Sequence, residues 1–282
     1  MYDPRMNYLD RQDFAVKAFR ELHQSGCFVL PNPFDIASAK YLQQLGFKAL
    51  ATTSAGFAFT RGLPDEVPAI PRDIMLDHIR ELVEATTLPV NADFQNGYAD
   101  EPEAIAESVR LCAATGVAGL SIEDNAGGAS YEESLAVERI KAARRAIDET
   151  KVPVVLTARC EAWLVGNPNA FEVAIKRLTA FADAGADCLY APGVSDPEQI
   201  SEIVKAVAPK PINVLVSRPD PNLTLARLSD LGVRRISVGS SLARVAWGAF
   251  MRASRSIAET GTFDSFGEAA SFAELNQVFK KP

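Results

Sequence analysis

The sequence predicts a closed (β/α)8 barrel, and three observations lead to that prediction. Short apolar runs alternate with longer segments of helical periodicity, which is typical of parallel strands joined by crossover helices. The apolar runs number eight, and the chain lacks the glycine fingerprint of a dinucleotide-binding sheet. Hydrophobic residues make up 48% of the 282 residues, which is enough to fill the core of a large barrel.

The strands and helices are expected in regular alternation. In chain order, the strands are expected at Cys27–Pro31, Ala49–Thr53, Pro89–Asp93, Gly119–Glu123, Val154–Arg159, Cys188–Ala191, Ile212–Val216 and Arg235–Val238. Helical segments follow them, for example Ile36–Leu45, Glu103–Ala114, Phe171–Ala184 and Leu223–Leu231. A glycine close after each of these segments, at Gly46, Gly116, Gly185 and Gly232, is expected to end the helix and lead into the next strand. Helix N-caps are expected at Asp35, Asp100 and Asp196.

Further helices are expected outside the eight repeats. Residues Met1–Ser25 have the pattern of an amphipathic helix before the first strand. After the eighth strand, a helix is expected at Ser240–Ala258, and a glycine-marked break at 261–267 separates it from a last helix at Glu268–Lys280. We therefore expect one barrel domain over residues 1–282, with 240–282 as a C-terminal helical extension.

The overall charge and the cysteines narrow the class of protein. A net charge of −7 is unfavourable for contact with nucleic acid or an anionic membrane, so neither is expected as a partner. The four cysteines lack the spacing of a metal site, and the sequence has no signal peptide or membrane-length apolar run. These features predict a cytoplasmic protein with reduced cysteines.

Charged side chains end three successive strands. Asp93 ends the third strand, Glu123 the fourth and Arg159 the fifth. The carboxyl ends of parallel strands meet at one edge of the fold, so these side chains are expected to share a ligand site. Two acidic ends followed by a basic end predict a divalent metal ion and a small anionic substrate. Asp100 and Asp124 are interpreted as caps or loop charges.

Motifs at the strand ends resemble one superfamily over nearly the whole chain. The segments are Thr52-Thr-Ser-Ala-Gly56, Gly62-Leu-Pro-Asp65, Asn91-Ala-Asp-Phe-Gln-Asn-Gly-Tyr98, Gly119-Leu-Ser-Ile-Glu-Asp124 and Thr157-Ala-Arg-Cys-Glu-Ala162. In order and position they resemble the isocitrate lyase and phosphoenolpyruvate mutase superfamily. The resemblance implies a barrel that binds Mg²⁺ or Mn²⁺ and small α-oxyacids. It also implies that C–C or P–C bonds are made or broken next to the oxyacid carbon.

The resemblance implies a metal site of acidic residues. Asp65, Asp93 and Glu123 match acidic positions of the superfamily and would hold the ion partly through water. The superfamily usually has Asp-X-Asp on the third strand, whereas this chain has Asn91 at the first position and a longer turn before Gly97. Asn91 is expected either to supply an amide oxygen or to leave Asp93 as the sole direct ligand. Both arrangements predict weak, exchangeable metal binding.

Arg159 is the expected substrate-binding cation. It matches an arginine that the superfamily uses against the substrate carboxylate or phosphonyl group, and its fork geometry suits bidentate capture. The alternative is a structural ion pair with Glu161 or Glu123. Cys160 should point to the opposite face of its strand, toward the helices, which makes it a poor nucleophile.

Backbone amides and two asparagines are the other candidates for substrate contact. A run of consecutive amides after the second strand can form an oxyanion nest, although an ordinary glycine-containing turn is the alternative. The candidate residues are Thr53, Ser54, Ala55, Gly56, Asn125 and Asn213.

Two superfamily motifs are absent. Isocitrate and methylisocitrate lyases carry Lys-Lys-Cys-Gly-His on the loop after the fourth strand, where this chain has Asp124-Asn-Ala-Gly-Gly-Ala-Ser-Tyr131. Isocitrate cleavage by the usual route is therefore not expected. The mutase branch has a histidine after the sixth strand, where this chain has Leu189-Tyr-Ala-Pro192. The only histidines, His23 and His78, lie on helical segments and are interpreted as surface or packing residues.

These observations predict a Mg²⁺-dependent lyase or decarboxylase. Its substrate would be a small 2-oxo- or 2-hydroxy-dicarboxylic acid, cleaved at a C–C bond through a metal-stabilised enolate. Arg159, Glu123 and Tyr98 are the expected catalytic residues. Tyr131 and Tyr190 are alternatives to Tyr98 as the proton donor or acceptor.

Two other functions stay open. One is P–C bond chemistry on phosphonopyruvate or phosphoenolpyruvate, by a mutase or hydrolase, with Asn125 or Ser130 in contact with the phosphonyl group. The other is a non-catalytic metabolite-binding barrel, in which Asn91 marks the decay of the metal site.

The apolar residues of the C-terminal extension predict assembly. At helical spacing they are Leu242, Val245, Ala246, Ala249 and Phe250, followed after the break by Phe263, Phe266, Phe272 and Leu275. This is more apolar surface than one barrel wall needs. Superfamily barrels often swap their eighth helix, so the resemblance implies exchange between subunits of a homotetramer, a dimer of dimers. The alternative is a tail that folds back on its own barrel.

Overall fold

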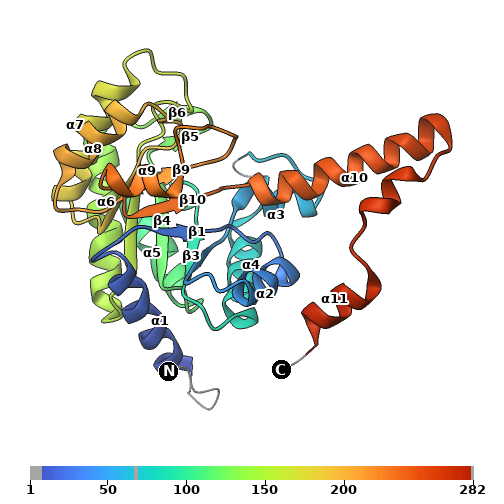
Figure 1. Ribbon diagram of the computed structural model, residues 1–282. Coiled ribbons are helices and arrows are strands. Elements are labelled where there is room, and N and C mark those ends of the chain that lie inside the picture. Colours follow the sequence, from blue (N-terminus) through green and yellow to red (C-terminus); the bar gives the residue numbers. More distant parts are fainter. Residues whose placement is uncertain (1–7, 67–68, 281–282) are drawn as a thin grey trace.

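The computed structural model describes residues 8–66 and 69–280, and eight parallel strands form its centre (Figure 1). The strands are β1 (Phe28–Leu30), β2 (Leu50–Ala51), β3 (Val90–Asp93), β4 (Gly119–Glu123), β7 (Val155–Arg159), β8 (Cys188–Tyr190), β9 (Ile212–Leu215) and β10 (Arg235–Ser237). Their order in the sheet is β1-β10-β9-β8-β7-β4-β3-β2. The predicted (β/α)8 barrel is confirmed, with every strand inside its expected range.

The seam between β1 and β2 is held together by fewer backbone contacts than the other strand pairs. The amide of Ala51 donates to the carbonyl of Pro31 at 3.0 Å. The buried side chain of Asn32 adds a second connection, because its amide group donates to the Thr52 carbonyl at 2.8 Å. Its oxygen accepts from the backbone of Val238 and Gly239 after β10, at 3.0 and 2.9 Å. One asparagine thus joins three strand ends at the seam.

Helices cover the outside of the barrel. They are α1 (Tyr8–Leu22), α2 (Ile36–Gln44), α3 (Ser54–Thr60), α4 (Arg72–Ala85), α5 (Pro102–Ala113), α6 (Glu133–Thr150), α7 (Ala170–Asp183), α8 (Pro197–Val207) and α9 (Leu225–Asp230). A short hairpin of β5 (Asn125–Ala126) and β6 (Ala129–Ser130) follows β4. The first seven residues of the predicted helix Met1–Ser25 lie outside the described residues, and α1 forms the part from Tyr8 onward.

Two of the three predicted N-caps are confirmed and one is wrong. Asp35 accepts a hydrogen bond from the amide of Ser38 at the start of α2, and Asp196 caps α8 in the same way. Asp100 does not cap α5, because Glu101 occupies the cap position. The Asp100 carboxylate instead accepts a hydrogen bond from the hydroxyl of Tyr131 at 2.5 Å, and this contact ties two loops together.

The strands separate a polar barrel interior from an apolar outer layer. Successive side chains of a strand point to opposite faces, so Ser121 and Glu123 of β4 line the interior while Leu120 and Ile122 pack against the helices. The other strands follow the same rule. The apolar core therefore lies between the sheet and the helices, and the barrel interior is left for polar chemistry.

The C-terminal arm comprises α10 (Ser241–Thr260), a 3₁₀ turn at Asp264–Glu268 and α11 (Phe272–Phe279). Figure 1 shows α10 running away from the barrel before the chain turns back. Within the arm, Ala243 is the only residue of α10 that is fully buried among the described residues. The return segment contacts α2, where the Gln44 side chain donates to the carbonyl of Val278.

None of the helices in the described part of the chain is both long enough and apolar enough to cross a membrane. The cytoplasmic setting and the organisation of residues 1–282 as a single domain stay predictions.

Candidate active site

A cavity of about 350 Å³ opens at the carboxyl ends of the strands. The side chains that line it come from both ends of the chain and from most of the strands between. Those used below are Asn32, Thr53, Ser54, Ala55, Asp65, Asn91, Asp93, Glu123, Asn125, Arg159, Glu161, Tyr190, Asn213, Arg235 and Ser237. The barrel therefore brings the predicted charged strand ends into one cavity, as expected from parallel strands.

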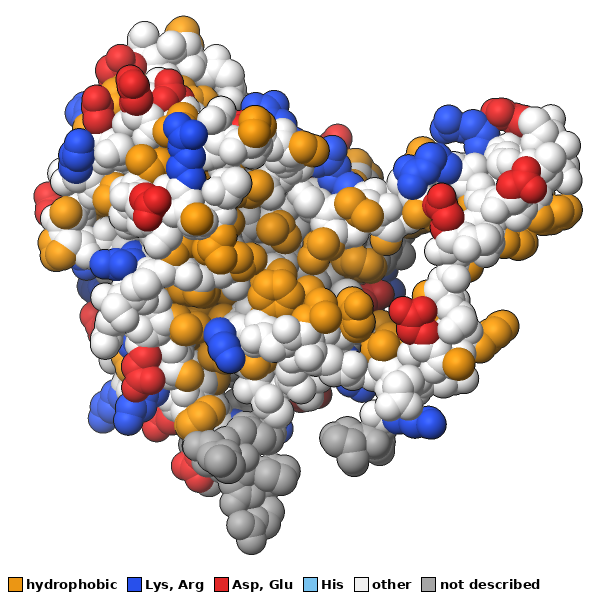
Figure 2. Space-filling model, viewed as in Figure 1, with side chains coloured by type: hydrophobic (Ala, Val, Ile, Leu, Met, Phe, Trp, Pro, Cys, Tyr) orange, Lys and Arg blue, Asp and Glu red, His pale blue; other side chains and the backbone are white. Residues whose placement is uncertain are grey.

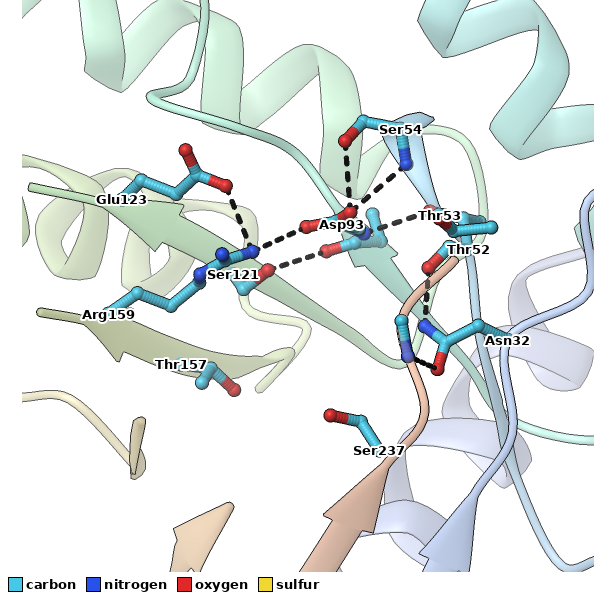
Figure 3. Close-up of polar contacts among 12 residues, drawn as sticks. Asn32, Thr52, Thr53, Ser54, Asp93, Ser121, Glu123, Thr157, Arg159 and Ser237 are labelled. Atoms are coloured by element: carbon cyan, nitrogen blue, oxygen red, sulfur yellow. Dashed lines mark hydrogen bonds and ion pairs between the residues drawn. The ribbon is translucent and has the colours of Figure 1, made fainter. Parts of the chain in front are cut away.

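Asp93 is held at the mouth of the cavity from two sides (Figure 3). On one side its Oδ2 accepts hydrogen bonds from the amide and the hydroxyl of Ser54, at 3.0 and 3.1 Å. On the other side its Oδ1 pairs with Nη1 of Arg159 at 2.8 Å. The backbone amide of Asp93 donates to the hydroxyl of Thr52 at 2.8 Å. Both oxygens of the carboxylate thus have fixed directions.

Arg159 lies among three carboxylates. Its Nη1 contacts Asp93 at 2.8 Å and Glu123 at 2.9 Å, and its Nε contacts Glu161 at 2.7 Å. Burial by itself would lower the pKa of Arg159, but these carboxylates raise the pKa well above its ordinary value. The ring of Tyr190 lies 4.9 Å from the guanidinium carbon, in cation–π range. The ion pairs with Glu161 and Glu123 that were the structural alternative are therefore present, and the role of Arg159 as the substrate-binding cation stays a prediction.

Glu123 and Glu161 are buried carboxylates with raised pKa values. Burial raises the pKa of Glu123, Arg159 opposes the rise, and the nearby Glu161 and Asp93 add to it. Burial likewise raises the pKa of Glu161, against the opposing effect of Arg159. Carboxyl groups in such an environment hold a proton at higher pH than they would in water. Glu123 thus has the electrostatics of a proton donor or acceptor.

Asp65 reaches the same cavity from the loop after α3. Its Oδ1 lies 3.5 Å from the Ser54 hydroxyl, which also bonds Asp93. Burial, followed by the charge of Asp93, raises the pKa of Asp65. Within the described residues, no three Asp, Glu, His or Cys side chains are grouped closely enough to bind a metal ion directly. The guanidinium of Arg159 lies between Asp93 and Glu123 instead.

The chemistry of the cavity nevertheless fits a hard cation held largely through water. Four carboxylates and two guanidiniums line it, which leaves an excess of negative charge. The side-chain oxygen of Asn91 is buried and accepts no hydrogen bond. A buried acceptor without a partner is costly unless a donor or a cation approaches it. The atoms available as metal ligands are all oxygens, which Mg²⁺ prefers, and Mg²⁺ usually keeps several of its waters.

Gly119 makes room for the Asn91 side chain. The two residues face each other across the β3–β4 pair, and a Cβ atom on Gly119 would lie 2.7 Å from the Asn91 oxygen. The same atom would lie 2.7 Å from the Phe19 ring. Any larger residue at 119 would therefore displace the amide oxygen from the cavity.

The predicted amide nest is only partly available. Thr53 caps α3, and its hydroxyl accepts the amide hydrogen of Gly56 at 3.1 Å. The amide of Ser54 is taken by Asp93. Thr53, Ser54 and Ala55 line the cavity, whereas Gly56 does not. Of the predicted run, Ala55 is the residue whose amide has no partner within its own helix, because it lies in the first turn.

Asn125 is on the β5–β6 hairpin that borders the cavity. Its side-chain nitrogen lies 3.4 Å from Oε2 of Glu123. Arg177 of α7 fixes both ends of this hairpin, through Asp124 at 2.8 Å and the Tyr131 carbonyl at 2.6 Å. Asp124 also accepts the amide of Glu161 at 2.8 Å. The interpretation of Asp124 as a cap or loop charge is wrong, since it is a buried anchor of the site.

Tyr98 does not reach the cavity. Its backbone has a φ of 58°, its ring packs against Phe94, and its hydroxyl is buried without a hydrogen-bond partner. Burial, together with the charge of Asp93, raises the pKa of Tyr98 far above its ordinary value. The tyrosine that does line the cavity is Tyr190, and Tyr131 bonds Asp100 outside it. The geometry thus favours Tyr190 over Tyr98 among the tyrosine candidates.

Asn213 lies in the lower part of the cavity. Its amide nitrogen donates to the hydroxyl of Ser237 at 2.9 Å, and its oxygen accepts from Nε of Arg235 at 2.9 Å. Sequence reasoning missed Arg235 and Ser237, because β10 carries no motif that distinguishes inward polar residues from structural ones. The alternation of Arg235 and Ser237 about Ile236 was the available signal.

The histidines are packing residues, as predicted. His78 stacks on Phe57 with ring centroids 3.7 Å apart, and burial lowers its pKa to about 4. His23 is half-buried beside the rings of Phe19 and Phe28, and this burial lowers its pKa to about 3. Neither residue lines the cavity.

The fold and the cavity define a (β/α)8 protein with a carboxylate- and arginine-lined site at the carboxyl edge of the barrel. Residues 19–258 match the sequence model of the family described as phosphoenolpyruvate phosphomutase, which covers well over half of the chain. The chain therefore belongs to that family, and so to the isocitrate lyase and phosphoenolpyruvate mutase superfamily that its motifs resemble.

Individual relatives support the assignment. The crystal structure of a provisionally named lyase/mutase from Burkholderia cenocepacia J2315 is 45% identical, has a TM-score of 0.92, and aligns over 97% of this chain and 98% of that chain. An uncharacterised protein of Mycobacterium tuberculosis (strain ATCC 25618 / H37Rv) is 35% identical over 79% of this chain and 82% of its own length. An oxaloacetate decarboxylase of Pseudomonas putida (strain GB-1) is 33% identical, over 79% of this chain and 77% of its own length.

Proposed function

We propose that the protein is a Mg²⁺-dependent carbon–carbon lyase or decarboxylase. Its substrate is a small 2-oxo- or 2-hydroxy-dicarboxylic acid. The observation that carries this proposal is the placement of Arg159 among Asp93, Glu123 and Glu161 in a cavity that also contains the unpartnered oxygen of Asn91. Similarity to an oxaloacetate decarboxylase supports the same class of reaction.

The cation would be held by Asp65, Asp93 and Glu123, with Asn91 as a further oxygen donor. Burial and mutual repulsion raise the pKa values of Asp65 and Glu123, and a divalent cation would offset that repulsion. When bound, it would supply stabilisation for negative charge that develops on the substrate oxygens.

The side chains of the site then have separable tasks. Arg159 presents a fixed, permanently charged fork, whose orientation is set by Glu161 on Nε and by the Tyr190 ring. Its contacts with Asp93 and Glu123 would yield in part to an incoming carboxylate. Glu123, which would hold the cation through water, would also carry a proton to or from the carbon at which the bond breaks.

A substrate panel tests the proposal. Oxaloacetate, methyl-branched 2-hydroxy-dicarboxylates and phosphonopyruvate would each be incubated with the purified protein and Mg²⁺, and products followed by nuclear magnetic resonance. We expect turnover of at least one dicarboxylate and no turnover of phosphonopyruvate. Cleavage of phosphonopyruvate alone would favour P–C chemistry. Absence of turnover for the whole panel, with tight binding of its members, would favour a binding protein.

We also propose that the C-terminal arm packs on a second copy of the chain. In Figure 2 the arm stands away from the body and carries apolar side chains. Among the residues of the arm, Val245, Phe250 and Phe272 are 69%, 61% and 88% exposed. Between α3 and α10 lies an apolar groove lined by Phe59, Leu63, Trp247 and Met251. A groove and a projecting helix on the same chain suit reciprocal docking, as in a helix-swapped homotetramer.

A further inference from the structure

The floor of the cavity contains a second arginine, with surroundings unlike those of Arg159. Arg235 begins on β10, and its side chain crosses the barrel interior to β7, where Nη2 donates to the hydroxyl of Thr157 at 3.1 Å. The residue is 2% exposed and is one of the residues that line the cavity. Arg235 thus closes the lower end of the space whose mouth is occupied by Arg159.

All the hydrogen-bond partners of Arg235 are uncharged. Besides Thr157, they are the side-chain oxygen of Asn213 at 2.9 Å and Nε2 of His23 at 3.3 Å. Burial, followed by the charge of Arg235, lowers the pKa of His23 to about 3, so this imidazole is neutral. Its Nδ1 lies 2.7 Å from the Phe19 carbonyl, which assigns the ring hydrogen to Nδ1 and leaves Nε2 as an acceptor.

The two arginines therefore differ in the charge that surrounds them. Arg159 pairs with three carboxylates, whereas Arg235 makes no ion pair with any carboxylate of the described residues. A guanidinium has five N–H donors. The contacts of Arg235 use one N–H on each of its three nitrogens, so two N–H donors remain without a partner. A buried cation without a counter-ion is unfavourable, and an anion that reaches it gains a charge-assisted hydrogen bond.

We infer that Arg235 is a second anion-binding residue, which receives the distal carboxylate of a dicarboxylic ligand. Asn213 lies beside Arg235 in the strand register and accepts a hydrogen bond from its Nε, and Ser237 in turn fixes the Asn213 amide group. The inference rests on the proposed function for the class of ligand, and it adds the residue that selects dianions over monoanions. Arg159 is already paired with carboxylates, so a second ligand carboxylate gains more binding free energy from Arg235.

The first part of the experiment uses the unaltered protein. Calorimetric titration without Mg²⁺ would compare succinate with succinamate, in which one carboxylate is replaced by an amide of similar size. We expect succinate to bind at least about tenfold more tightly, the value for one hydrogen bond between charged groups. Equal affinity, or no binding of succinate, would overturn the inference.

The second part identifies the arginine responsible. In Arg235→Met the preference for succinate should disappear, and in Arg235→Lys it should be partly kept. Arg234→Met is the matched control. Arg234 is next to Arg235 in the sequence, but its side chain lies outside the barrel and donates to the Gly26 carbonyl. The control should keep the full preference. If Arg235→Met retained the preference, Arg235 would not be the receptor.

A further variant covers the case in which Arg235→Met fails to fold. Asn213→Asp keeps the arginine and nearly the same shape, but it places a carboxylate on the atom that Nε of Arg235 already contacts. An ion pair between Asp at position 213 and Arg235 should abolish the preference for succinate. An unchanged preference contradicts the inference. Binding is measured without turnover, so a protein that prefers succinate through Arg235 but cleaves no dicarboxylate would reject only the proposed function. Cleavage of oxaloacetate by a protein whose preference is independent of Arg235 would reject only the inference.

Discussion

The barrel and the C-terminal arm both have amphipathic helices, but the apolar side chains are buried in the barrel and exposed in the arm. In α7 of the barrel, Leu178 and Phe181 are fully buried against the strands. In the arm, Phe250 and Phe272 remain exposed, at 61% and 88%. The barrel even buries polar groups such as Asn91 and Arg235. The barrel thus contains the partners that its helices need, whereas the apolar side chains of the arm remain available for the second copy of the chain proposed above.

This difference separates chemistry from assembly. The candidate site is formed by strand ends that are fixed by the apolar layer around them, so its residues should affect binding and rate. The arm contributes little to that layer, and its residues should affect the mass of the particle. The predictions for Asp93, Arg159 and the arm are therefore each paired with a control variant outside the feature that is tested.

The largest effect is expected at Asp93. Asp93→Ala removes an oxygen donor of the proposed cation site and the partner of both Ser54 and Arg159. Turnover should fall by at least about a hundredfold, because stabilisation by a metal ion contributes several kcal/mol. Calorimetry should show weaker Mg²⁺ binding, while light scattering should show an unchanged mass. Asp196→Ala, which removes a helix cap far from the cavity, is the control. Wild-type Mg²⁺ affinity in Asp93→Ala would show that the site is wrongly assigned.

Arg159→Lys should have the next largest effect. Lysine keeps the charge but loses the fork that contacts Glu161 and that is proposed to bind the substrate carboxylate. We expect kcat/KM to fall by the equivalent of about 1.5–3 kcal/mol of transition-state stabilisation, which is the contribution of a hydrogen bond to a charged group. Arg110→Lys changes an exposed arginine that pairs with Glu107 and Glu149, and should leave the kinetics unchanged. Unchanged kinetics for Arg159→Lys on the true substrate would remove Arg159 from the binding site.

The arm should respond in mass and not in rate constants. Phe250→Ser removes an exposed aromatic ring whose burial in an interface is worth about 1.5–3 kcal/mol, so dissociation should occur at higher protein concentration. Deletion of residues 263–282 should weaken assembly further. Ile74→Ser, at an apolar residue of α4 that is also exposed, is the control and should have no effect on mass. Light scattering that shows the unaltered protein to be a monomer at micromolar concentration would reject the assembly.

The smallest effect concerns the pH dependence of barrel stability at His78. Its folded-state pKa is lowered to about 4, below the ordinary value of 6.5, mainly by burial. Its contribution is therefore complete above pH 6.5 and is lost as the pH falls toward 4, by about 1.4 kcal/mol per pH unit. His78→Phe keeps the stacking on Phe57 and removes the titration. Urea unfolding would give the free energy of unfolding of both proteins at pH 7 and at pH 5. Between pH 7 and pH 5 the variant should gain stability relative to the unaltered protein. The same difference between the two proteins at both pH values would contradict this prediction.

Local patterns predicted the repeats well but not their ends. Every strand of the barrel was expected where it occurs, because alternation and glycine stops are local properties of the chain. The second strand is shorter than expected at Ala49–Thr53, since Thr53 leaves the ladder to cap α3. The β5–β6 hairpin was not predicted, although Gly127-Gly128 is a signal for a tight turn with positive φ.

The candidate site divides along the same line. Asp93, Glu123 and Arg159 were predicted because each follows an apolar run directly. Tyr98 was misplaced, because the turn after Asp93 reverses the chain through residues of positive φ and turns the ring into the core. Arg235 and the anchor between Asp124 and Arg177 were missed, since their partners lie far away in sequence.

The sequence by itself determined the number of strands, their order and the charged residues at their carboxyl ends. Periodicity, caps and stops act over a few residues, so they can be recognised without the rest of the chain. The tertiary structure alone decided which carboxylates surround Arg159, which arginine remains without one, and which tyrosine reaches the cavity. Those outcomes depend on how eight strands are staggered around a common axis, and a stagger of two residues along a strand moves a side chain from the mouth of the barrel to its floor.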